Sequence, residues 1–293
     1  MKEIFFKGVK IFEFNDDKVI QIVGSNNYLI RVITEIYHKV FTGYRFSDID
    51  IEAMNGYYPE IRENGKVLKK NDILVIKTSD IEDILDQLTI KRNSVLTQYI
   101  LSLNNNLLIS KSLENIDQSL TELSILIDEF MKEKIATEEL HIKTDVVNIN
   151  LDKIIKTFID INFLNQYEER TPLWLLDDYQ AIDLFLNIIK IILEDGKKTK
   201  IIIDKIDSKI DINNYKMLIK ELFNLTEEYS NLGLWIIPGS KEGVLVDYKV
   251  FNNTYIINEE VTVLRDFELT YESICRNYPS NDVPTRKEVL VSL

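Results

Sequence analysis

The chain has 293 residues, enough for one large domain or two smaller ones, and 45% of them are hydrophobic, so a sizeable core is available. Its 35 Lys and Arg residues are outnumbered by 48 Asp and Glu residues, which gives a formal net charge of −13 at pH 7. This balance opposes non-specific binding to nucleic acid, which depends on neutralising phosphates. Contact with DNA would therefore require Lys and Arg concentrated locally on an acidic molecule.

Composition also excludes several kinds of site. Cys275 is the only cysteine, so the chain has no internal disulfide and no multi-cysteine metal site. His38 and His141 are the only histidines and are far apart in sequence, which argues against a zinc site. The N-terminal sequence lacks the long apolar core of a signal peptide, and no uncharged apolar run approaches about 20 residues. We therefore expect a soluble, cytoplasmic protein.

The first part of the chain is predicted to be rich in strands. Runs of β-branched and aromatic residues predict these strands, and apolar side chains at helical spacing predict a helix over residues 26–41 that ends at Gly43. A strand that leads through a turn into a helix is therefore expected around residue 24. The predicted strands are residues 4–6, 9–14, 19–23 and 73–77.

Helical periodicity replaces the strand pattern from residue 81. Residues 81–103 predict one long helix, interrupted near Asn93 and Ser94. A second run has apolar residues at alternating spacings of four and three, the heptad pattern of a coiled-coil-like helix. Its apolar seam needs a partner, either an antiparallel helix of the same chain or a helix of another chain. The seam consists of Ile109, Leu113, Ile116, Leu120, Leu123, Ile127 and Phe130.

Strand and helix signals alternate again towards the end of the chain. Residues 179–193 predict a helix that is apolar nearly all round, which is typical of a buried helix. The following segments alternate as a parallel sheet covered by helices requires. We therefore expect an α/β head built from residues 1–79 and 197–293, with a helical leg domain inserted at residues 80–196. The later predicted strands are residues 200–203, 234–237, 255–257 and 261–264, and the later helices are residues 213–229 and 271–278.

The loop after the strand at residues 19–23 is the first candidate site. It consists of Gly24, Ser25, Asn26 and Asn27 and precedes a helix, whose N-terminal N–H groups attract anions. A working phosphate loop has the pattern Gly-x-x-x-x-Gly-Lys-Ser/Thr. Counted from Gly24, the second Gly, the Lys and the Ser or Thr are all absent. We therefore interpret the loop as a degenerate phosphate loop and expect no ATP to bind; Gly24 forms the turn, and Ser25 or Asn26 caps the helix.

Two acidic residues are candidate metal ligands. The predicted strand at residues 200–203 is followed by Asp204, as in a Walker B segment whose carboxylate holds magnesium, and Asp207 follows nearby. Hard divalent cations prefer such oxygen ligands. Without a Lys in the loop, however, this carboxylate lacks its usual task. Solvated or helix-capping carboxylates are the alternative interpretation.

Two basic clusters are candidate DNA contacts. Lys91 and Arg92 lie in the first predicted helix of the insertion, and Lys197, Lys198 and Lys200 surround the start of a predicted strand. Each cluster alone is typical of a solvated surface. Several copies of the chain lining a shared concave channel would instead concentrate these charges on a duplex.

Three stretches resemble one known family, the type II-A CRISPR adaptation protein Csn2 in its large subtype. They are residues 14–27, residues 200–215 and residues 278–286, the last followed by the ending Val-Ser-Leu at residues 291–293. The sequence YPSNDVPTR at residues 278–286 is the most specific, because nothing in the physics of a fold demands that string. Members of the large subtype usually continue beyond it, so we expect either a truncated chain or a shorter natural variant.

The resemblance implies properties that the residues alone do not show. It implies an α/β head related to ABC- and RecN-type ATPases but without their activity, and an extended helical leg. It implies homotetrameric rings that bind double-stranded DNA ends through a central hole, with calcium ions stabilising the assembly. The implied partners are the CRISPR integrase and the guide-RNA nuclease during spacer capture. A ring would concentrate Lys side chains from several copies on its inner wall, which reconciles DNA binding with the acidic net charge.

Three functions follow as hypotheses. The favoured one is a non-enzymatic DNA-end-binding ring protein, in keeping with the lack of a Ser or Cys motif to pair with His38. The second is a nucleotide-binding regulator of the ABC/SMC-like class, which the missing loop Lys opposes. The third is a structural adaptor that docks to the nuclease through the acidic outer faces of the heptad helix. Those faces carry Glu114, Asp117, Glu122, Asp128, Glu129 and Glu133.

Overall fold

The computed structural model describes residues 1–15, 19–69, 72–91, 93–135, 146, 150–158, 162–164, 167–247, 250, 252–264, 267–276 and 283–292. The strands are β1 (Lys2–Phe6), β2 (Val9–Phe14), β3 (Val19–Val23), β4 (Glu60–Glu63), β5 (Lys66–Val67), β6 (Leu74–Thr78), β7 (Phe163–Leu164), β8 (Arg170–Thr171), β9 (Thr199–Asp204), β10 (Leu232–Ile237), β11 (Thr254–Ile257) and β12 (Val261–Leu264). The α-helices are α1 (Asn27–Thr42), α2 (Asp48–Ala53), α3 (Ile81–Gln87), α4 (Val95–Ser102), α5 (Leu107–Ile135), α6 (Leu151–Phe158), α7 (Asp178–Glu194), α8 (Ile212–Glu228), α10 (Phe267–Cys275) and α11 (Arg286–Ser292).

A six-stranded sheet forms the centre of the molecule, in the order β12-β11-β3-β10-β9-β6. Its neighbouring strands run parallel except for β12, which is antiparallel to β11. In the middle, Leu234 of β10 lies opposite Val19 of β3 and Ile201 of β9. Every residue of β10 is buried, as expected for a strand covered on both faces. The parallel sheet predicted from the alternating strand and helix signals is confirmed.

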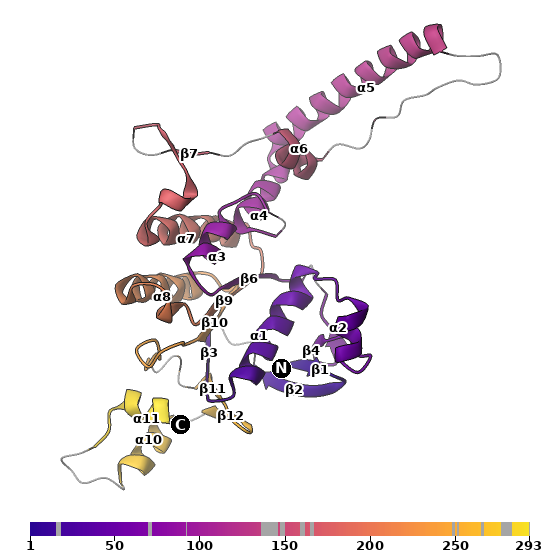
Figure 1. The fold of residues 1–293 in the computed structure, drawn as a ribbon. Helices are drawn as coiled ribbons and strands as arrows, with labels where there is room; N and C mark the ends of the chain where they lie inside the picture. The colour runs from indigo at the N-terminus through magenta and orange to yellow at the C-terminus, as the bar shows by residue number, and fades with distance from the viewer. Residues whose placement is uncertain are drawn as a thin grey trace.

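Each face of this sheet has its own hydrophobic core. On one face, α1 and the small sheet β2-β1-β4-β5 pack together, and the rings of Tyr37 and Trp235 are in contact, tilted by 44° with centroids 4.5 Å apart. On the other face, α3, α4, α7 and α8 pack against β6, β9 and β10, with Phe185 and Leu218 fully buried. Figure 1 shows α1 on one side of the sheet and α7 and α8 on the other.

The heptad segment is one helix. Helix α5 has 29 residues and extends away from the sheet in Figure 1. Several residues of the predicted seam remain accessible; Leu123 is 50% exposed and Phe130 is 66% exposed. Residues 136–145, which follow α5 in the chain, lie outside the described residues.

Local chemistry explains where the structure departs from the predicted elements. The interruption predicted near Asn93 and Ser94 is present and divides residues 81–103 into α3 and α4: Asn93 adopts a left-handed conformation with φ of 65°, and Ser94 caps α4, its Oγ accepting from the Thr97 N–H at 3.2 Å. The final predicted helix begins earlier than expected, at Phe267, and α11 follows it. Strands β4 and β5 were not predicted, since they are short and largely polar.

The cores cross both predicted domain boundaries. Helices α3, α4 and α7 all fall within the predicted insertion at residues 80–196, yet they pack in the same core as β6 and β9. Helix α7 is apolar on nearly all sides, and such a helix is stable only when it is buried. It therefore packs within this core rather than in a separate domain. The part that extends from the sheet therefore begins after α4. No helix among the described residues is both long and apolar enough to cross a membrane.

Candidate functional site

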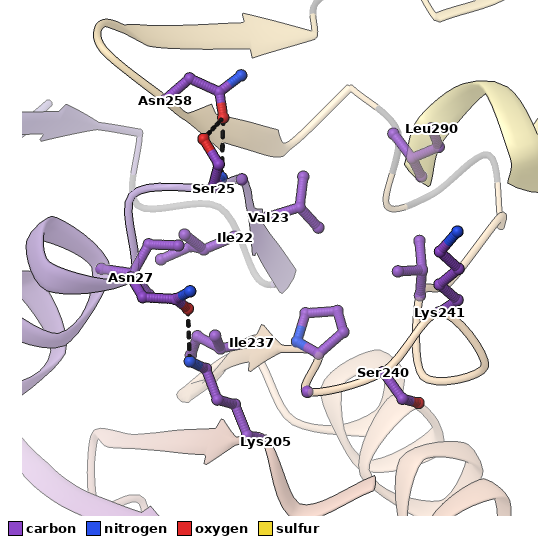
Figure 2. Close-up of a pocket in the computed structure, with 15 residues that line it drawn as sticks. Ile22, Val23, Ser25, Asn27, Lys205, Ile237, Ser240, Lys241, Asn258 and Leu290 are labelled. Carbon is purple, nitrogen blue, oxygen red and sulfur yellow. Dashed lines mark hydrogen bonds between the residues drawn. The ribbon is translucent and has the colours of Figure 1, made fainter. Parts of the chain in front are cut away.

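A pocket of about 520 Å³ lies at the carboxyl ends of β3, β10 and β11. In open parallel sheets, ligands bind outside the carboxyl ends of the strands, where neighbouring connections diverge. Here β3 leads into α1 on one face of the sheet, and β6, the next strand of this sheet along the chain, lies at the far edge. The degenerate phosphate loop forms one wall, as Figure 2 shows. Residues 238–241, after β10, form the opposite wall.

The backbone N–H groups of the degenerate phosphate loop are bound to protein acceptors. The Ser25 N–H donates to Oδ1 of Asn258 at 2.8 Å, and the Asn26 N–H donates to the Ile257 carbonyl at 3.1 Å. The Asn27 N–H donates to the Ser25 carbonyl at 2.9 Å. In a working phosphate loop these donors cradle the phosphates. The turn between β11 and β12 therefore occupies donors that would otherwise be available to a nucleotide's phosphates.

Glycine is required where the loop meets this turn. Gly24 has a φ of 134°, and a Cβ atom built on it would overlap the backbone of Ile257. Asn26 then caps α1, its Oδ1 accepting from the Leu29 N–H at 3.0 Å and its Nδ2 donating to the Asn258 carbonyl at 3.1 Å. The predicted turn at Gly24 and cap at Asn26 are both present, and Asn258 is the partner that the sequence did not reveal.

A lysine from another strand approaches the loop. Nζ of Lys205, the residue after β9, donates to Oδ1 of Asn27 at 2.7 Å. Lys205 has a φ of 63°, a left-handed conformation that is uncommon for a lysine. The loop itself contains no Lys, and Lys205 is about 180 residues further along the chain. The sequence could have indicated this contact, because Lys205 directly follows β9 and the carboxyl ends of parallel strands meet at one edge of a sheet.

Asp204 is paired with a lysine. Oδ2 of Asp204 lies 3.0 Å from Nζ of Lys77, and the same Nζ lies 2.5 Å from Oε1 of Glu35 on α1. Burial acts to lower the pKa of Lys77, but its bonds to the two carboxylates raise that pKa above the ordinary value. In Glu35, burial acts to raise the pKa, and the bond to Lys77 outweighs it and lowers that pKa. The ammonium group thus supplies the positive charge that a metal ion supplies in a Walker B site.

Asp207 fixes the opposite wall of the pocket. It is buried, 8% exposed, and its Oδ1 accepts from the Gly239 N–H at 2.7 Å. Its Oδ2 accepts from both the N–H and the hydroxyl of Ser240, each at 2.7 Å. Asp204 and Asp207 therefore bind protein groups on separate sides of the loop after β9. Among the described residues, no three His, Cys, Asp or Glu side chains come together as a metal site, and calcium binding stays a prediction.

The candidate DNA contacts differ in accessibility. Lys198 is exposed, and Lys197 donates to Oε1 of Gln98 on α4 at 2.8 Å. Lys91 is exposed and paired with Asp86. Arg92 lies outside the described residues.

Lys200 requires a correction, because it is only 3% exposed. Its side chain lies over Gly233 of β10, where a Cβ atom would overlap its ammonium group. Lys200 belongs to a buried strand of the central sheet, and its side chain follows the sheet rather than facing solvent. The burial of Lys200 in this structure argues against a direct contact with a duplex.

Comparison with known proteins agrees with this fold. Residues 7–293 match the family described as CRISPR-associated protein Csn2 subfamily St. The crystal structure of Stu0660 of Streptococcus thermophilus superposes with a TM-score of 0.75 at 24% identity, covering 98% of this chain and 82% of that one. CbiO1 of Clostridium perfringens, part of the ABC transporter complex cbiONQ, gives a TM-score of 0.41 at 11% identity, covering 97% and 90%. No curated protein matches the sequence significantly. Because the family match spans nearly the whole sequence, the chain belongs to the CRISPR-associated Csn2 family, subfamily St.

Proposed function

We propose that this protein binds double-stranded DNA ends as a homotetrameric ring during CRISPR spacer acquisition and that it catalyses no reaction itself. Family membership supports a role in CRISPR adaptation. The single observation that carries the non-enzymatic part is the closure of the loop at Gly24, Ser25, Asn26 and Asn27 by the turn between β11 and β12. The head is accordingly a degenerate P-loop fold, and α5 forms the core of its helical leg.

The two halves of an ATPase site are each replaced by internal contacts. The N–H groups of Ser25 and Asn26, which would bind phosphates, are bound to Asn258 and Ile257. Asp204, which would hold magnesium, is neutralised by Lys77. Binding ATP in the usual way would require breaking both sets of contacts, and unpaired buried groups are costly. This argues against the nucleotide-binding regulator.

For the DNA interface we propose Lys91, Lys197 and Lys198, with Arg92 next to them in sequence. The bond between Lys197 and Gln98 connects the start of β9 to α4, the helix that follows Lys91. This is the amino-terminal edge of the sheet, away from the pocket. Four copies facing inward would concentrate these charges around a duplex and offset the acidic net charge.

Calcium is proposed to stabilise the assembly, and the integrase and guide-RNA nuclease are the proposed partners. Calcium takes six to eight oxygen ligands. Asp204 and Asp207 are engaged with Lys77, Gly239 and Ser240, so ligands from more than one copy of the chain are the better candidates. Sedimentation velocity with calcium and with a chelator tests this: a tetramer that dissociates on chelation is expected, and an unchanged species contradicts the calcium role.

End recognition is tested by blocking the ends. A linear duplex with biotin at both termini is titrated with the protein in a gel shift, with and without streptavidin. The proposal predicts that streptavidin added first abolishes binding, because a ring must pass over an end. Binding that is unaffected by streptavidin would contradict end entry. The same duplex without biotin controls for direct effects of streptavidin.

A structural adaptor is the second candidate, and the surface of α5 favours it. Leu123, Leu126 and Phe130 are each at least half exposed on α5, and acidic residues accompany them along the helix. An adaptor would lose its protein partner, and keep DNA binding, when Glu122, Asp128 and Glu129 are replaced by Gln. The DNA-end-binding ring predicts that linear DNA still binds and that purified protein binds it without the nuclease.

A further inference from the structure

Two lysines at the pocket carry charge that the described residues do not neutralise. Lys205 and Lys241 both line the pocket, from opposite sides in Figure 2. Within the described residues, no carboxylate lies within 4.0 Å of either ammonium group, whereas Lys77 and Lys209 each have such a partner. The bond that Lys205 makes is to a neutral amide oxygen, that of Asn27.

We propose that this pocket binds a single phosphate group, with the ammonium groups of Lys205 and Lys241 supplying the positive charge. The hydroxyl of Ser25 lines the same space and can rotate to donate to a phosphate oxygen, leaving the Ser25 N–H on Asn258. Charge-assisted bonds of this type are the strong ones in phosphate recognition. Asp207 lies behind the wall at Ser240, with its oxygens turned to backbone and hydroxyl donors, so its charge is partly offset.

The contacts of the loop limit the ligand to one phosphate. A triphosphate needs the row of loop N–H donors and a metal ion, and those donors are occupied here. A single phosphate needs only the ammonium groups of Lys205 and Lys241. The rest of the lining is largely apolar, with Val23, Ile237 and Val244 among its members, so the group attached to the phosphate would rest on an apolar surface. The volume of about 520 Å³ is in the usual range for a small-molecule site.

The backbone of Lys205 indicates that its position is specified. Left-handed residues other than Gly and Asn cost conformational energy and are concentrated at functional sites. An Asn at this position would relieve the strain, yet the chain has a lysine with φ of 63°. Among the residues that the structure describes, no salt bridge accounts for that lysine. A ligand anion gives its charge a role.

The inference goes beyond the proposed binding of DNA ends and stands or fails separately from it. A phosphate monoester reaches the pocket from one of two sources, a free nucleotide or the 5′ terminus of a DNA strand. Both present the same doubly charged group at neutral pH. The test therefore uses free probes first and DNA second.

The full chain is titrated with inorganic phosphate and with adenosine monophosphate, without divalent metal, by isothermal calorimetry and by thermal shift. Lys205→Asn removes the charge while suiting the left-handed backbone, and Lys241→Gln removes the other charge. Each is expected to weaken binding about tenfold, since charge-assisted bonds are worth that much. Lys205→Arg is expected to keep most of the affinity. Lys190→Gln, on an exposed face of α7, is the matched control and is expected to change nothing.

Each result of these titrations either supports or overturns the proposed phosphate site. Absence of binding of both probes to the wild-type chain, or equal affinity in Lys205→Asn, Lys241→Gln and the wild type, overturns the proposal. Both lysines line the pocket surface, so the variants are expected to fold. Thermal unfolding of each variant without ligand checks this. If the free probes bind, duplexes with 5′-phosphate and with 5′-hydroxyl ends are compared. A difference that disappears in Lys205→Asn assigns the phosphate to DNA, and equal affinities assign it to a free ligand.

Discussion

Nζ of Lys77 lies 3.0 Å from Oδ2 of Asp204, so the carboxylate at the end of the Walker B-like strand is paired with a cation of the neighbouring strand. Both side chains are largely buried, 14% and 16% exposed. Replacing Lys77 by Met leaves Asp204 without its partner, and we expect a loss of about 2 kcal/mol in the free energy of unfolding. Urea denaturation measures it.

The matched control for that variant is Lys39→Met. Nζ of Lys39 is 3.7 Å from Glu35 in a more exposed pair, so its loss is expected to cost less than about 0.5 kcal/mol. If both variants lose the same free energy of unfolding, the pair between Lys77 and Asp204 contributes no more than the exposed pair.

The close contact of Gly24 with the turn between β11 and β12 predicts that a side chain at this position destabilises the fold. Gly24→Ala is expected to destabilise the fold by more than about 2 kcal/mol, because the new Cβ atom would overlap the backbone of Ile257 and the φ of 134° is unfavourable for alanine. Gly196→Ala is the control, since Gly196 also has a positive φ, 79°, but open space around it. Similar midpoints in thermal unfolding for the two variants would contradict the close contact.

The pKa of His38 gives the stability a pH dependence. Burial lowers that pKa; Lys77 and Lys39 act in the same direction, and Glu35 and Asp83 oppose them. Because the folded protein binds a proton here less readily than the unfolded chain, stability is greatest above the unfolded pKa of about 6.5 and falls as the pH decreases towards the folded pKa. His38→Gln removes this part of the loss.

The measurement is the midpoint of thermal unfolding between about pH 7.5 and about pH 5, a window set by the imidazole. The wild type is expected to lose stability across the window more steeply than His38→Gln. Below that window both proteins lose stability as carboxylates such as Glu35, whose pKa is lowered, become protonated. Parallel curves above about pH 5 would mean that His38 does not titrate differently on folding.

The two lysines at β9 separate DNA contact from stability. Lys198 is exposed, and Lys198→Glu is expected to lower affinity for linear DNA severalfold while leaving the unfolding midpoint unchanged. Lys200 is buried, and Lys200→Met is expected to leave DNA affinity unchanged. A larger effect on DNA binding from Lys200→Met than from Lys198→Glu would reverse the assignment. Fluorescence anisotropy on a labelled duplex provides the affinities.

The sequence was most informative where one local signal decides the structure. The strand predicted at residues 234–237 from its apolar run is present within β10, and Gly43 ends α1 as predicted, with φ of 67°. The absence of a Lys from the loop predicts that it does not bind ATP, and this stays a prediction. By contrast, α7 was assigned to the leg, because its apolar pattern shows that it is buried but not against what.

Contacts between distant segments were beyond the reach of local patterns. Nothing near Gly24 reveals that Asn258 binds the loop, and nothing near Asp204 reveals Lys77. Lys200 looked like part of a surface cluster because charge is visible in sequence and burial is not; β9 is buried on both faces, so Lys200 is covered whichever face it lies on. These pairings depend on the strand order, which follows from the packing of the whole chain.

Entry of DNA through its ends is tested most directly with closed circles. Linear duplex and covalently closed circular duplex of equal length are titrated in gel shifts, with and without calcium and at rising salt. A ring that encircles DNA predicts binding of the linear form only, weakening steeply as salt competes for the phosphates. Equal binding of both forms, or binding of neither, would contradict the ring and favour the adaptor.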